Sequence, residues 1–180
     1  MPGHLVCRPK MFDEQRRPSG SSEPATVSHV TSAMSGKFFL DTNLLVYAID
    51  PTEPGKQAVA QKWIASAHQS GDGCLSYQVV QEWFNVVLRK AAVPISTEQA
   101  ASIYRTLIEP LWHVQSSREL VDTAIDLHQH DSLSWWDSLI VSAAIRGGCD
   151  SLLSEDLQHG RKVRGVKIIN PFRKVESRAP

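Results

Sequence analysis

Four carboxylates stand beside apolar segments, where an ionised acid needs a chemical reason to be. Asp41 ends the apolar run 38–40, and Asp156 closely follows the apolar run 151–153. Glu82 shares a helical face with neighbouring valines, and Asp137 borders an apolar helical stripe. An unpaired ionised carboxylate in such a place costs several kcal/mol, so it needs a cation or a set of hydrogen-bond donors.

The chemistry that suits four such acids is metal binding. Brought together, they would repel one another strongly unless a divalent cation were bound. Carboxylate oxygens without His or Cys favour Mg²⁺, with Mn²⁺ as the alternative, over Zn²⁺. A cation of this kind beside a phosphate chain supports phosphodiester hydrolysis by an activated water. The catalytic residues and the metal ligands are therefore predicted to be the same four: Asp41, Glu82, Asp137 and Asp156.

Each acid also has a simpler interpretation that stays open at this level. Asp41 stands where an acid commonly turns a strand into a helix. Asp137 lies three residues after Ser134, in a first helical turn that favours negative charge, and Asp156 is predicted to lie in another first turn. Glu82 is the hardest to explain as a cap, because it lies well inside its helix. The joint pattern favours the functional interpretation.

The elements that must position these acids alternate along the chain. Apolar runs and breaker residues predict strands at 38–40, 74–76, 112–114, 151–153 and 165–169. Amphipathic segments and capping signals predict helices at 44–49, 56–70, 77–92, 96–108, 116–128 and 135–146, and a short one from residue 154. Alternation of this kind predicts an α/β fold, a three-layer α/β/α sandwich with a central parallel sheet. Ligands of such folds lie beyond the carboxyl ends of the strands, where Asp41 and Asp156 are expected.

Four motifs then resemble the PIN-domain family, closest to its small bacterial single-domain members, including the VapC-type toxins. They are Phe38-Phe39-Leu40-Asp41-Thr42-Asn43, Gln78-Val79-Val80-Gln81-Glu82, Trp136-Asp137-Ser138-Leu139-Ile140 and Leu153-Ser154-Glu155-Asp156-Leu157. The resemblance covers residues 37–172. It implies a Mg²⁺-dependent endoribonuclease with the four acids in the site. Supporting roles fall on Asn43, which matches the family's common asparagine, and on Ser154, where the family usually has threonine.

The same resemblance sets expectations about partners. It implies an RNA substrate, a cognate antitoxin protein, a homodimer and a cytoplasmic location without a membrane. Two alternatives remain. A phosphotransferase with Asp41 as covalent nucleophile would carry a second acid two residues on, where this chain has Asn43. A non-catalytic RNA-binding or regulatory module would keep the fold without the chemistry.

The substrate contacts must come from local features, because the formal net charge is zero. Arg161, Lys162 and Arg164 form the main basic concentration, and they follow the Asp156 loop. Trp135 is predicted to be exposed and available to stack on a base, whereas Trp136 is predicted to belong to the core.

The chain of 180 residues is expected to divide into three parts. Residues 1–35, rich in Pro, Ser and Arg, are predicted to be a disordered extension, residues 36–174 the nuclease domain, and residues 175–180 a disordered tail. Translation is hypothesised to start at Met34. The 3 widely spaced cysteines fit a reducing compartment, and no apolar run approaches the ~20 residues of a membrane-spanning helix.

Overall fold

Six strands form one sheet within residues 36–89 and 95–173, which are the residues that the computed structural model describes. In spatial order they are β3 (Trp112–Val114), β2 (Gly73–Ser76), β1 (Phe38–Leu40), β4 (Ser151–Leu153), β6 (Val166–Ile169) and β5 (Lys162–Val163). All neighbours pair in parallel except β5, which is antiparallel to β6. The predicted N-terminal extension, the hypothesised start at Met34 and the predicted tail lie outside the described residues.

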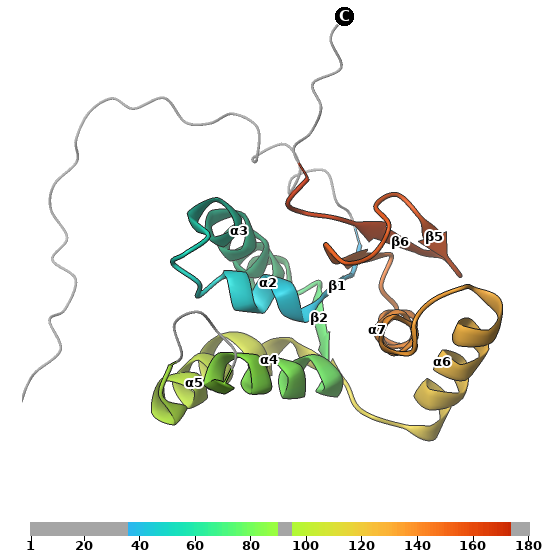
Figure 1. The fold of residues 1–180 in the computed structure, drawn as a ribbon, viewed down its shortest axis with the longest axis horizontal. Helices are drawn as coiled ribbons and strands as arrows, with labels where there is room; N and C mark the ends of the chain where they lie inside the picture. Colours follow the sequence, from blue (N-terminus) through green and yellow to red (C-terminus); the bar gives the residue numbers. More distant parts are fainter. Residues whose placement is uncertain (1–35, 90–94, 174–180) are drawn as a thin grey trace, which may run out of the picture.

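Helices cover the sheet on both faces, as the three-layer prediction requires (Figure 1). Figure 1 shows one group beside β1 and β2, and a second group, α6 and α7, on the other side. The first group consists of α2 (Thr42–Tyr47), α3 (Pro54–Ser70), α4 (Tyr77–Arg89) and α5 (Thr97–Ile103), and α5 continues into a π-helical turn (Tyr104–Ile108) and a 3₁₀ turn (Glu109–Leu111). The second consists of α6 (Arg118–His130) and α7 (Trp135–Arg146). No helix in the described part of the chain is long and apolar enough to cross a bilayer.

The core explains why the central strands read as continuous apolar runs. All three residues of β1 and all three of β4 are buried, since helices lie on both faces of these strands. Trp63 of α3 packs edge-on against Phe38, with ring centroids 5.6 Å apart. Trp83 of α4 is fully buried as well. Burial of a large apolar side chain stabilises the fold by roughly 1.5–3 kcal/mol. In the case of Trp83 this fixes α4, the helix that carries Glu82.

The capping signals locate two helix starts correctly and misplace a third. The predicted capping box at Ser96 and the predicted cap at Ser134 are confirmed as the N-caps of α5 and α7. The predicted cap at Ser116 is wrong, because Ser117 accepts the hydrogen bond from the Leu120 backbone and α6 begins at Arg118. Adjacent serines offer the same signal one residue apart, and the sequence alone does not separate them.

Two further expectations fail near the end of the chain. The predicted short helix from residue 154 does not form, because the Ser154 hydroxyl bonds to Asp41 and to the Asp156 backbone instead. The sequence does not predict strand β5. Because β5 pairs antiparallel with β6, the sheet is not wholly parallel. A two-residue turn joins β5 to β6, and both of its residues, Arg164 and Gly165, have positive φ values of 46° and 99°.

Candidate active site

Asp41 is both a helix cap and the centre of the candidate site. It lies immediately after β1, and its backbone is extended (φ −78°, ψ 161°) before α2 begins. Its Oδ1 accepts a hydrogen bond of 2.7 Å from the Thr42 backbone N–H. Its Oδ2 accepts one of 2.6 Å from the Ser154 hydroxyl, which follows β4. The cap and the site are therefore one arrangement, and the two interpretations of Asp41 do not exclude each other.

Glu82 reaches the same place from the middle of α4. Its Oε2 accepts a hydrogen bond of 2.9 Å from the Thr42 hydroxyl, and its Oε1 accepts one of 2.8 Å from Gln78 Nε2. The residue is half-buried. These two donors are the partners that a carboxylate on this helical face requires, and Thr42 joins it to the residue next to Asp41.

Asp156 lies on the exposed loop after β4 rather than in a helix. The Ser154 hydroxyl accepts a 3.2 Å hydrogen bond from the Asp156 backbone N–H. The side-chain amide of Asn43 donates to Asp156 Oδ2 over 3.4 Å, which is a long and weak contact. Ser154 and Asn43, the two residues predicted to support the site, thus both contact predicted site acids.

The electrostatics show that two of the other acids, Glu82 and Asp156, act on Asp41. The pKa of Asp41 is raised from 3.8 to about 6, chiefly because burial disfavours the charged form. Hydrogen bonds from Ser154 and Thr42 lower this pKa, and the negative charges of Asp156 and Glu82 raise it. Asp41 therefore lies in the field of two further carboxylates, which is the situation that a bound cation would relieve.

Asp137 is held differently. Its Oδ2 accepts a 2.7 Å hydrogen bond from the Ser134 hydroxyl, and its backbone N–H donates to the hydroxyl oxygen of Ser134 over 3.2 Å. Its charge is not among those that shift the pKa of Asp41. The structure thus connects Asp41, Glu82 and Asp156 through contacts and charge, and places Asp137 in the cap of α7.

The donor chemistry of the site fits a hard divalent cation. The side-chain oxygen Oδ1 of Asn43 is buried and, within the described ranges, has no hydrogen-bond partner. It adds an amide oxygen to the carboxylates, and such oxygens suit Mg²⁺ or Mn²⁺. No three His, Cys, Asp or Glu side chains in residues 36–89 and 95–173 already form a group that could hold a metal. The ligand types are therefore suitable, while the side chains as placed do not form a complete set.

The basic residues near the Asp156 loop are partly engaged in the fold. Arg161 donates to the backbone carbonyl of Asp131, and Arg164 forms ion pairs with Asp126 and, at 3.0 Å, with Asp131. These contacts attach the β5–β6 hairpin to α6. Lys162 is exposed on β5. Of the three predicted phosphate contacts, the two arginines would have to share their guanidinium groups with these acids.

Of the two adjacent tryptophans, Trp135 is exposed as predicted and Trp136 is not buried as predicted. Trp135 is 37% exposed, as expected of a stacking residue, and Trp136 is 63% exposed. The prediction that Trp136 belongs to the core is therefore wrong. Both residues occupy the first turn of α7. The ring of Trp135 meets the edge of His128, with centroids 6.4 Å apart.

The sequence does not predict a set of contacts that holds the Asp156 loop through the neighbouring residue, Glu155. Glu155 accepts a hydrogen bond of 2.6 Å from the Tyr47 hydroxyl and forms an ion pair of 2.7 Å with Lys56. The ammonium group of Lys56 also donates to the Tyr47 hydroxyl over 2.8 Å. The pKa of Lys56 is raised, first by Glu155 and then by Tyr47. The sequence signals these contacts only through the position of Glu155 next to Asp156, since Lys56 and Glu155 are 99 residues apart.

Comparison with known proteins gives the fold a family. The family model of the PIN domain matches residues 38–164. No curated protein matches the chain. Among solved structures, FitAcB from Neisseria gonorrhoeae is 16% identical, with a TM-score of 0.54 over 76% of this chain and 99% of that one. FitAB bound to an IR36 DNA fragment is also 16% identical, with a TM-score of 0.54 over 79% and 99%.

A third similar structure extends the comparison. It is the Mycobacterium tuberculosis toxin VapC20, described as cleaving the sarcin-ricin loop. It shares 16% identity and has a TM-score of 0.46, covering 64% of this chain and 87% of that one. At such identities the two FitAB structures bear on the fold alone, whereas the family model covers most of the chain, including the first three predicted acids and Asp156. The chain belongs to the PIN-domain family.

Proposed function

We propose that the protein is a divalent-metal-dependent endoribonuclease that hydrolyses RNA phosphodiester bonds. The observation that carries the proposal is that contacts and charge connect Asp41, Glu82 and Asp156, and that the pKa of Asp41 is raised to about 6. They come from three separate places in the chain: the end of β1, the middle of α4 and the loop after β4. A carboxylate whose pKa is strongly raised and that lies beside two further carboxylates favours a functional site over a structural one. Membership of the PIN-domain family supports the same conclusion.

Each residue has a proposed part in the reaction. Asp41, Glu82 and Asp156 hold the cation, and Asp137 contributes a fourth carboxylate from α7. The cation, when bound, neutralises the phosphate and activates water for attack. Thr42 positions Glu82, and Ser154 positions Asp41, through the hydrogen bonds of 2.9 Å and 2.6 Å. The side chain of Asn43 contacts Asp156 through its amide nitrogen Nδ2, and its buried oxygen Oδ1 is proposed as a further ligand of the cation.

Glu155 is proposed to be a positioning residue rather than a catalytic one. Both of its carboxylate oxygens are engaged, one by Tyr47 and the other by Lys56. The backbone of the Asp156 loop is thereby fixed on one side by Glu155 and on the other by Ser154. Asp156 itself is exposed, so this support limits where its carboxylate can lie.

The proposal is tested by cleavage of labelled RNA in the presence and absence of Mg²⁺. Wild-type protein is expected to cleave only with Mg²⁺, and Asp41→Asn is expected to lose cleavage while keeping its fold. Asp122→Asn is the matched control, because Asp122 is an exposed acid on α6, and it should cleave as wild type does. Equal cleavage by wild type and Asp41→Asn would remove Asp41 from the site. RNA that is bound but intact in every condition would favour the non-catalytic RNA-binding module.

The proposed partners rest on the resemblance of the four motifs to VapC-type toxins. We propose an antitoxin protein and a homodimeric state. Co-expression with the product of the adjacent open reading frame, followed by mass measurement of the purified complex, tests both. Copurification with loss of RNA cleavage is expected. A monomer that purifies alone and remains active in the presence of that product would contradict both.

A further inference from the structure

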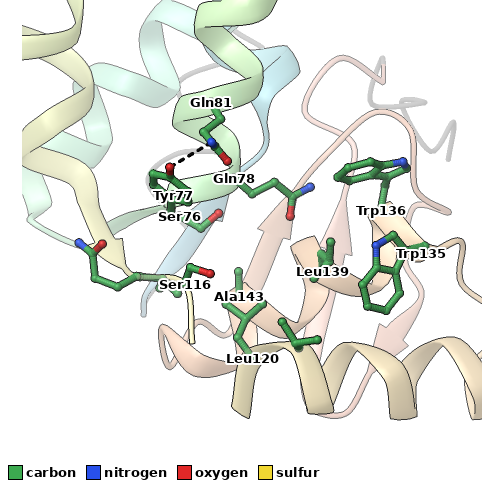
Figure 2. A pocket seen from close by; sticks show the side chains of 13 residues that line it. Ser76, Tyr77, Gln78, Gln81, Ser116, Leu120, Trp135, Trp136, Leu139 and Ala143 are labelled. Carbon is green, nitrogen blue, oxygen red and sulfur yellow. Dashed lines mark hydrogen bonds between the residues drawn. The ribbon is translucent and has the colours of Figure 1, made fainter. Parts of the chain in front are cut away.

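An aromatic pocket opens beside the acids, between the start of α4 and the start of α7 (Figure 2). Its volume is about 250 Å³. Figure 2 shows Trp135 and Trp136 on one wall, and Tyr77, Gln78 and Gln81 on the opposite wall. Apolar side chains of α6 and α7 form its floor. Side chains from distant parts of the chain therefore enclose a single space.

None of the side chains that line the pocket is charged. The lining offers aromatic faces together with hydroxyl and carboxamide groups. A phosphate would find no cation among these residues, whereas a neutral, flat ring with its own donors and acceptors would find both a stacking surface and hydrogen-bond partners. The volume lies below the roughly 300–1,000 Å³ of drug-sized sites, so it suits one ring system.

Both walls are connected directly to predicted site acids. On α4, Gln78 lines the pocket and donates to Glu82 over 2.8 Å. On α7, Trp136 lines the pocket and precedes Asp137 in the chain. Within the described ranges, no hydrogen bond reaches the Oε1 atom of Gln78, so this acceptor is available to a ligand. A ring held here lies one side chain, that of Gln78, away from Glu82.

We propose that this pocket binds one unpaired base of the RNA substrate, adjacent to the phosphate that is cleaved. The inference rests on the proposed function and assigns a substrate-specificity site to it. The exposed face of Trp136 stacks on the base, and the carboxamide groups of Gln78 and Gln81 contact its edge. The hydroxyl of Tyr77, which accepts a 3.0 Å hydrogen bond from Gln81, orients that carboxamide. A base-paired nucleotide would not fit, because its edge and both faces are already occupied.

The test measures RNA binding without cleavage. The full-length protein is titrated, in EDTA, into a fluorescently labelled single-stranded RNA of about eight nucleotides, and anisotropy is recorded. Trp136→Ala is expected to weaken binding about tenfold, which lies within the range that one base–aromatic stack contributes. Trp136→Phe should retain most of the affinity. Leu107→Ala is the matched control, because Leu107 is likewise an exposed apolar side chain but lies outside the pocket.

A second arm removes the base instead of the tryptophan. RNAs carrying one abasic nucleotide, placed in turn along the strand, are compared with the intact strand. At one position the abasic change should weaken binding to the wild type about tenfold, and it should have little further effect on Trp136→Ala, because the two changes remove the same contact.

Two outcomes would overturn the pocket assignment. One is Trp136→Ala binding RNA as tightly as wild type, and the other is wild-type protein binding no RNA at all. Trp136→Ala that changes from dimer to monomer in sedimentation, with unchanged affinity per protomer, would assign the surface to a second copy of the chain instead. Abasic-sensitive binding by a protein that fails to cleave with Mg²⁺ would support the pocket and reject only the ribonuclease proposal.

Discussion

The two sides of the candidate site are built in different ways. On the Asp41 side, contacts between residues far apart in the chain set the positions of the acids. Ser154 is 113 residues from Asp41, and Thr42 is 40 residues from Glu82. On the Asp137 side, the acid is held by Ser134, three residues away in the cap of the same helix. The contacts of Asp41 and Glu82 require the whole fold, whereas the contact of Asp137 requires only that α7 forms.

This difference indicates how the two sides respond to a cation. Burial raises the pKa of Asp41 to about 6, and the negative charges of Asp156 and Glu82 add to this effect. These three carboxylates are therefore the part of the site where a cation yields the largest gain in stability. Asp137 already has a satisfied hydrogen bond in its cap, and it must exchange that bond to act as a ligand. We expect the Asp41 side to provide most of the affinity for metal.

The largest effect is expected from removing the contact that joins β1 to β4. Ser154→Ala deletes a fully buried hydroxyl that donates to Asp41 and accepts from the Asp156 backbone. The free energy of unfolding should fall by roughly 2–3 kcal/mol, because a buried carboxylate loses a donor. Urea unfolding near neutral pH measures the change. A loss below about 0.5 kcal/mol, the usual range of a surface substitution, would contradict the proposed support of Asp41.

Asp41→Asn should change stability in the opposite direction. Because burial raises the pKa of Asp41 from 3.8 to about 6, its protonated form is favoured in the fold. The corresponding stability is fully present below the unfolded value of 3.8 and is lost as the pH rises through about 6. Without metal at about pH 7, the variant should therefore be more stable than wild type by about 2 kcal/mol.

The control for this prediction is the difference between the unfolding curves of the two proteins across the same pH range. Exposed acids such as Asp126, whose pKa is lowered by Arg164, contribute equally to both proteins and cancel. Asp122→Asn should leave the free energy of unfolding within about 0.5 kcal/mol of wild type. If the difference in free energy of unfolding between wild type and Asp41→Asn stays constant from about pH 4 to pH 7, the pKa of Asp41 is not raised in the fold.

Tyr47→Phe tests whether the contacts of Glu155 position the Asp156 loop. The change removes a hydroxyl that donates to Glu155 and accepts from Lys56. We expect the free energy of unfolding to fall by about 1 kcal/mol. We also expect RNA cleavage to require more Mg²⁺, which loss of stability alone would not cause. An unchanged Mg²⁺ dependence would reject Glu155 as a positioning residue.

The smallest effect is expected on the Asp137 side. Ser134→Ala removes the N-cap of α7 and should lower the free energy of unfolding by up to about 1 kcal/mol. Its Mg²⁺ affinity should change less than that of Ser154→Ala, since Asp137 provides less of the binding. Ser116→Ala is the matched control because Ser116 caps no helix, and it should unfold like wild type. A larger loss of Mg²⁺ affinity in Ser134→Ala than in Ser154→Ala would reverse the comparison of the two sides.

The sequence predicts those parts of the fold that depend on local patterns. Alternating apolar runs place the parallel strands, and serine caps place the starts of α5 and α7. Local patterns fail where a side chain is engaged by a distant partner. Ser154 bonds to Asp41 instead of starting a helix. Trp136 fails in another way, because its apolar character predicts burial and the folded chain leaves it exposed.

The candidate site follows the same division. The position of Asp41 after a strand and the unusual face of Glu82 are visible in the sequence. The contacts of Glu155 with Tyr47 and Lys56 are not, because no local spacing encodes a contact across 108 or 99 residues. The aromatic pocket is equally hidden, since its walls come from α4 and α7. Residue types and short motifs identify the acids, while topology determines what surrounds them.

Direct titration of Mg²⁺ into the protein by calorimetry tests whether Asp41, Glu82 and Asp156 bind a divalent cation. Wild-type protein and Asp122→Asn should bind Mg²⁺ with the same affinity, and Asp41→Asn, although folded and more stable without metal, should show no measurable binding. Equal Mg²⁺ binding by Asp41→Asn and wild type would contradict the account.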